Sequence, residues 1–118
     1  MEIPIHNADR IPLPPQETKI HSLSGQAWPD GRRVQVRVET TPFQQRPNLH
    51  ICILNDQGLE VASMIVTQIL RTQLEFTLHL RAPETQGRYT VAAHLTYPDL
   101  ELDSLGRIES SFEITSNH

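Results

Sequence analysis

The fold is indicated most clearly by residues 73–81, which have the sequence QLEFTLHLR. Every second residue of this stretch is apolar: Leu74, Phe76, Leu78 and Leu80. Successive side chains of a β-strand point to opposite faces of the sheet. The alternation therefore predicts a strand with one face in a core and the other in water.

The same alternation recurs on both sides of this strand. Further strands are predicted at residues 34–38, 48–54, 88–97 and 107–115, with a weaker one at 18–24. Turn-forming residues separate them, and no long amphipathic helix lies between them. Because a sheet with one apolar face needs a second sheet to cover it, the pattern predicts an all-β fold, an immunoglobulin-like two-sheet β-sandwich of about seven strands. The expected core comprises Leu49, Ile51, Ile53, Leu74, Phe76, Leu78, Tyr89, Val91, Ala93 and Phe112.

Residues 59–69 form the seventh predicted strand, although a helix is the competing interpretation. Five of these residues are β-branched, which favours a pleated sheet over a helix. The apolar positions change parity along the segment, and we expect a β-bulge near Ser63 and Met64.

The chain is expected to hold one domain, since 118 residues is close to the commonest domain size. Residues 1–16 contain four prolines and show neither strand nor helix periodicity, so they are expected to form an extended leader. Residues 17–118 then form the sandwich.

Two short motifs resemble known immunoglobulin-like domains. Residues 84–91, ETQGRYTV, are similar to the start of the sixth strand, where a tyrosine after a tight corner bonds back to the preceding loop. Tyr89 would be that tyrosine, with its hydroxyl bonded to the main chain of residues 83–86. Together with residues 53–61, ILNDQGLEV, the pattern looks like bacterial immunoglobulin-like modules, including macroglobulin-type domains and the polysaccharide-binding sandwiches of some export ATPases. The resemblance implies a role in binding, spacing or assembly, and no ligand residue is carried over from it.

Composition argues against several classes of partner. The formal charge is −4 and no basic stripe is present, which argues against nucleic acid. There is no apolar run of about 18 residues, so no membrane span is predicted. The first residues lack the pattern of a signal peptide, and the single cysteine, Cys52, cannot form an internal disulfide. We expect a cytoplasmic protein, or a periplasmic or extracellular one if a longer precursor was trimmed.

One cluster has the chemistry of a metal site. His50, Cys52 and His94 are expected to share the outer face of one sheet, where two imidazoles and a thiolate could hold Zn²⁺. The alternative, which we favour, is a cross-strand histidine pair beside a half-buried thiol. No catalytic motif accompanies these residues, so we expect no enzyme, no catalytic residue and no cofactor.

The segment 59–70 is too apolar for a strand at the edge of a sheet, and we expect something to cover it. The candidates are the leader and a second copy of the chain in a homodimer, of which we favour the second. The interface would contain Val61, Met64, Val66 and Ile69. The function predicted from sequence is a non-catalytic binding or assembly module acting through protein–protein contacts, with a carbohydrate- or polymer-binding sandwich and a metal-binding protein as the alternatives.

Overall fold

The computed structural model describes residues 11–81 and 86–115, except for the side chains of residues 103 and 104. These residues form seven strands and two short 3₁₀ turns, η2 (Pro15–Glu17) and η3 (Pro98–Leu100). The strands are β1 (Ile20–Ala27), β2 (Arg33–Thr40), β3 (Asn48–Leu54), β4 (Glu60–Val66), β5 (Gln73–His79), β6 (Gly87–Tyr97) and β7 (Leu102–Ile114). Within the described ranges, no helix has the length and apolar character needed to cross a membrane.

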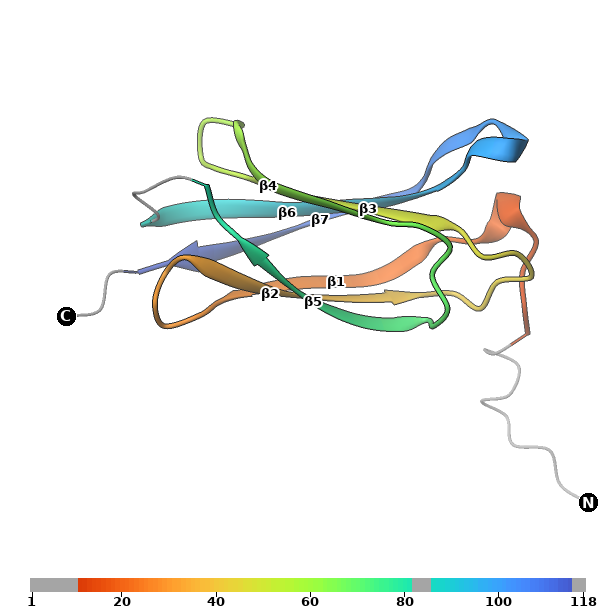
Figure 1. The fold of residues 1–118 in the computed structure, drawn as a ribbon, viewed down its shortest axis with the longest axis horizontal. Helices are drawn as coiled ribbons and strands as arrows, with labels where there is room; N and C mark the ends of the chain where they lie inside the picture. The colour runs from red at the N-terminus through yellow and green to blue at the C-terminus, as the bar shows by residue number, and fades with distance from the viewer. Residues whose placement is uncertain (1–10, 82–85, 116–118) are drawn as a thin grey trace, which may run out of the picture.

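The strands form two antiparallel sheets packed face to face, which confirms the predicted sandwich (Figure 1). One sheet has the order β1-β2-β5 and the other the order β4-β3-β6-β7. In constant-type immunoglobulin domains, by contrast, the fourth strand joins the sheet of the first, second and fifth strands. Here β4 pairs with β3 instead, so β5 is left as the edge of its three-stranded sheet.

The two sheets meet over the apolar faces that alternation predicts. Val34, Val36 and Val38 of β2 lie opposite Leu78, Phe76 and Leu74 of β5. On the outer face of the same pair, Arg37 Nε donates to Glu75 Oε2 at 2.8 Å. Apolar pairs on one face and an ion pair on the other keep this sheet in register, since a one-residue slip would exchange the two faces.

One side of the sandwich is closed by the packing of β1 along β7. Gly25 of β1 permits this approach, because a Cβ built there would lie 2.9 Å from Phe112 Cδ1. Gly106 of β7 has φ +61°, and a Cβ there would lie 2.7 Å from Lys19 Cα. Two glycines without side chains therefore let the sheets meet on this side.

The opposite side, bordered by β4 and β5, is open. The two strands meet at one end, where Arg81 N donates to Val61 O at 3.0 Å, and diverge toward residues 67–72, which join them at the other end (Figure 1). Ile69 closes that end, since its side chain is 2% exposed and its N–H donates to Pro47 O. Between the two ends, we call the gap the β4–β5 seam.

The seam corrects the predicted core. Leu74 and Phe76 of β5 are only partly buried, because none of the strands that residues 11–81 and 86–115 form covers the free side of β5. The other eight predicted core residues belong to the buried cluster, which extends to Val34, Val36 and Leu95.

The bulge in β4 is present but lies before the predicted position. Ile53 pairs with Ala62 and Leu54 with Glu60, so Val61 is the extra residue. Val61 and Ala62 are consequently both buried, and from Ser63 onward the odd-numbered residues face outward. The parity change was expected two residues later, near Ser63 and Met64, and is corrected to Val61.

The described part of the leader is bound to the body. Leu13 forms a parallel bridge with Phe43, its N–H donating to Pro42 O and its carbonyl accepting from Gln44 N. Thr18 is buried and its Oγ1 donates to Pro14 O at 3.0 Å. Residues 11–17 therefore lie along the loop of residues 41–47 and do not cover β4, while residues 1–10 lie outside the described part.

Candidate functional site

The outer face of the four-stranded sheet carries the histidine and cysteine cluster. His50 of β3 and His94 of β6 are direct cross-strand partners, and Cys52 lies two residues along β3. The imidazole rings stack with centroids 4.6 Å apart and planes 10° from parallel. His50 Nε2 is 3.0 Å from Thr96 Oγ1, so this ring nitrogen already has a hydrogen-bond partner.

This stacked geometry bears on the zinc hypothesis. The lone pairs of an imidazole lie in its ring plane, so nearly parallel rings do not aim them at one point, as a tetrahedral ion requires. Among residues 11–81 and 86–115 no group of three His, Cys, Asp or Glu side chains is arranged to hold a metal ion. Burial raises the pKa of the Cys52 thiol, which disfavours the thiolate that binds zinc. Zinc binding by His50, Cys52 and His94 stays a prediction.

Two shallow hollows lie on this outer face. One is lined by residues that include His50, Cys52, Ser63, Ile65, Ala92 and His94. The other extends toward η3 and is lined in part by Thr96, Pro98 and Leu102. Both hollows include His50 and Ile65, so the face is concave from β4 to the end of the β6–β7 hairpin.

The four predicted interface residues lie in the core or at its border. Val61 and Ile69 are buried in the core, and Met64 and Val66 are partly buried against it. After the bulge, Met64 and Val66 face inward and keep part of their surface exposed at the seam, and an interface through these four residues stays a prediction.

Three apolar residues of the same segment that were not predicted to form the interface are exposed. They are Leu59, Ile65 and Leu70, with exposed fractions of 60%, 61% and 73%. Ile65 lies in the segment predicted to be covered but is not among the four predicted interface residues. A bulge placed at Val61 would have assigned it to the outer face.

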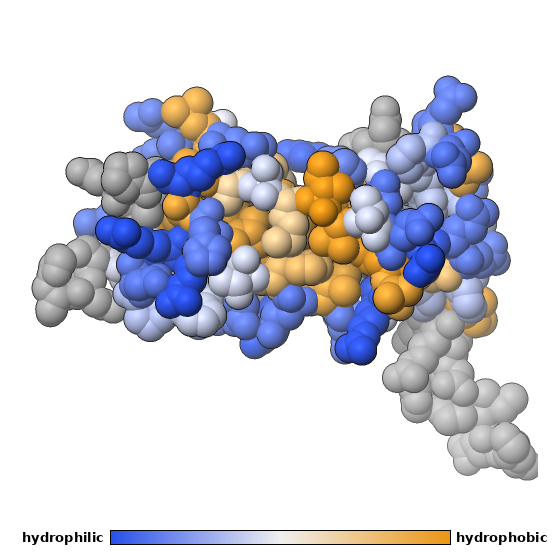
Figure 2. Space-filling view, in the orientation of Figure 1, coloured by the Kyte–Doolittle hydropathy of each residue, from blue (hydrophilic) through white to orange (hydrophobic). Residues whose placement is uncertain are grey.

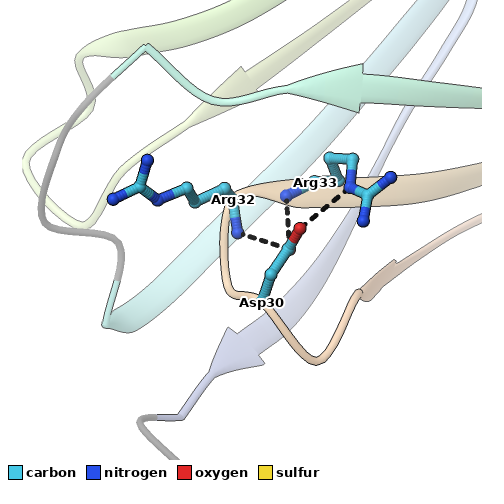
Figure 3. A network of polar contacts seen from close by, with 3 residues as sticks. All are labelled: Asp30, Arg32 and Arg33. Carbon is cyan, nitrogen blue, oxygen red and sulfur yellow. Dashed lines mark hydrogen bonds and ion pairs between the residues drawn. The ribbon is translucent and has the colours of Figure 1, made fainter.

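The turn before β2 holds a separate polar network (Figure 3). Asp30 Oδ1 accepts from the main-chain N–H groups of Arg32 at 2.9 Å and Arg33 at 3.3 Å, and Oδ2 accepts from Arg33 Nε at 2.9 Å. The Arg33 guanidinium also lies 4.0 Å above the centre of the Trp28 ring. One face of the Trp28 ring, an aromatic surface of the kind that can stack on a sugar, is thus occupied by a cation–π contact.

Comparison with known proteins supports the fold. No known protein family matches the sequence, and no curated protein matches it. Among solved structures, β-glucuronidase from Bifidobacterium dentium superimposes with a TM-score of 0.58 and 18% identity, over 85% of this chain and 19% of that one. A glycosyl hydrolase family 2 member from Bacteroides cellulosilyticus gives 0.54 and 16%, over 82% and 14%. A β-glucuronidase from Ruminococcus gnavus gives 0.53 and 15%, over 84% and 16%.

At these identities the likeness concerns the fold. The chain spans less than a fifth of the length of each of these proteins. It is an immunoglobulin-like two-sheet β-sandwich, similar in fold to a small part of much larger bacterial chains.

Proposed function

We propose that this chain is a non-catalytic binding or assembly module that acts through protein–protein contacts. The observation that carries the proposal is the β4–β5 seam. Apolar side chains from both strands remain partly exposed there: Met64 and Val66 on β4, and Leu74 and Phe76 on β5. Figure 2 shows apolar residues gathered in the middle of the face on which β4 and β5 lie.

Apolar surface gathered in this way favours a partner. Burying apolar area stabilises a contact by roughly 25 cal/mol for each Å² removed from water. Contiguous exposed apolar patches on small soluble domains commonly mark interaction sites. Ile65 on the outer face of β4 and Leu70 in the connection from β4 to β5 add further exposed apolar surface.

The cysteine chemistry is consistent with a non-catalytic role. Cys52 is half-buried in the middle of β3, and burial raises its pKa. A cysteine nucleophile acts as the thiolate and needs a lowered pKa, so Cys52 is poorly suited to attack a substrate.

Site-specific photo-crosslinking tests the proposal. Benzoylphenylalanine at position 65, beside the seam, is expected to give a discrete protein adduct at native expression levels in the source cells. The same probe at Glu113, exposed on the far edge of the four-stranded sheet, is the control and should give none. Adducts at neither position, or equal adducts at both, would overturn the proposal.

A carbohydrate-binding sandwich is the second candidate. It is favoured by the likeness in fold to parts of glycosyl hydrolase family 2 and β-glucuronidase chains. Against it, Tyr89, Tyr97 and Phe112 are buried, so few aromatic side chains remain for a sugar platform. A glycan array that includes glucuronides tests this candidate. Saturable binding that is lost in Trp28→Ala would favour it over a protein partner.

A further inference from the structure

We infer that the free edge of β4 pairs antiparallel with β4 of a second copy of this chain, joining the two four-stranded sheets into one. The inference rests on the proposed function and specifies its partner. An edge strand turns unpaired N–H and C=O groups outward, and these groups are best satisfied by another strand.

The edge of β4 lacks the features that normally block strand addition. Residues 61–70 contain neither a charged residue nor a proline. Native proteins protect exposed edges with charge, proline or bulges. The bulge at Val61 and the bond from Arg81 N to Val61 O protect only the first part of β4, which leaves residues 63–66 available.

The other sheet edges differ from β4. The β5 edge carries Glu75 and His79, and β7 carries Arg107, Glu109 and Glu113. β1 packs along β7 on the closed side of the sandwich. Of the four edge strands that the described residues form, β4 is the one that is both uncharged along its free part and uncovered.

The sequence of β4 is compatible with pairing to itself. Antiparallel pairing centred on Ile65 sets Ile65 against Ile65 on the outer face, with Ser63 opposite Thr67. On the inner face it sets Met64 opposite Val66. No like charges are opposed, and the apolar pairs are of the kind that stabilises neighbouring strands.

The same pairing covers exposed apolar surface. Ile65 loses the part of its exposure that the partner's Ile65 covers, and the second copy lies beside the partly buried Met64 and Val66 at the border of the seam. A two-fold axis through the two Ile65 residues generates a closed dimer, the commonest symmetry of soluble oligomers.

Sedimentation of the full chain over a concentration series tests the pairing. The unmodified chain is expected to form a dimer at high micromolar concentration. Ile65→Lys opposes two ammonium groups at the centre and should raise the dimer dissociation constant by at least about tenfold. Leu59→Lys is the control, because Leu59 is equally exposed but precedes the strand. A monomeric unmodified chain, or equal weakening by both variants, would overturn the inference.

Disulfide trapping tests the register. In a Cys52→Ser background, Ile65→Cys should be oxidised rapidly to a covalent dimer, because directly opposed Cα atoms lie about 4.5 to 5.5 Å apart. Glu113→Cys should not crosslink at the same rate. A dimer that cannot be trapped at position 65 contradicts the register.

The two proposals can fail separately. A photo-adduct at position 65 with a different protein and none with a second copy overturns the β4 pairing and leaves the proposed function standing. A monomer that also gives no adduct overturns both.

Discussion

The turn between β1 and β2 depends on one carboxylate. Asp30 accepts two main-chain N–H groups and the Arg33 side chain. These contacts, led by the bond from Arg32 N–H, hold the pKa of Asp30 below its ordinary value. The bond from Arg33 Nε to Asp30 also holds the guanidinium over the Trp28 ring.

Asp30→Asn should therefore change the pH dependence of stability. A carboxyl whose pKa is lower in the folded state stabilises the fold above its unfolded pKa of about 3.9 and loses that effect as the pH falls through the folded pKa. The parent protein should exceed the variant in free energy of unfolding at pH 7, and the difference should shrink below about pH 4. Urea unfolding at both pH values measures it, and a difference independent of pH would contradict the assignment.

The hydroxyl of Tyr97 binds the main chain of a loop that is distant in the sequence. This hydroxyl donates to Gln45 O at 2.7 Å, and burial raises its pKa. The sequence predicts such a contact for Tyr89 with the main chain of residues 83–86, of which 83–85 lie outside the described part, so the contact stays a prediction. The Tyr89 ring stacks on Phe112, with ring centroids 5.7 Å apart.

Tyr97→Phe should lower the free energy of unfolding by about 1 kcal/mol, the usual value of one hydrogen bond. The variant keeps the buried ring and removes only the oxygen, so packing is preserved. Chemical denaturation measures the loss, and unchanged stability would mean that Gln45 O is satisfied by water. Tyr89→Phe, measured alongside, tests the predicted corner contact independently.

Pairs of strands are held together differently on the two sides of the sandwich. On the closed side β1 approaches β7 closely at Gly25, next to Phe112 and Val91. On the open side β4 and β5 diverge, and their inner side chains stay partly exposed.

Gly25→Ala should be destabilising by about 1 to 3 kcal/mol, since the new methyl overlaps the Phe112 ring and the core has no room for it. Ser24→Ala, on the exposed face of the same strand, is the control and should change stability little. Adding Phe112→Leu to Gly25→Ala should recover part of the loss. If Gly25→Ala is neutral, the ring moves aside and the closed side is looser than described.

The whole molecule is a wedge, closed along β1 and β7 and open along β4 and β5. This shape predicts that one leucine contributes less than another on the same face of β5. Leu78→Ala removes a buried side chain and should cost about 2 to 5 kcal/mol, whereas Leu74→Ala, at the seam, should cost clearly less. Urea unfolding of both variants measures the contrast, and equal losses would show that the seam is covered in solution.

Alternation alone was enough to predict the strands and most of the core, because a period of two specifies which side chains face inward within each strand. Leu49, Ile51 and Val91 are buried as expected for this reason. The bulge was also predicted, because Val61 and Met64 cannot share a face without one. The predicted position was wrong by two residues, since a bulge at any of several positions fits the same order of apolar and polar residues.

The alternation within one strand does not specify which strand it pairs with. The tertiary structure decided the strand order. Pairing of β4 with β3 leaves β5 paired on one side only, with β2, so Leu74 and Phe76 are half-exposed although their alternation is that of core residues. The same pairing turns Val66 inward and Ile65 outward, so Ile65, which is not among the four predicted interface residues, is the exposed one. Strand order depends on contacts between residues far apart in the chain, and the periodicity of a single strand does not predict these long-range contacts.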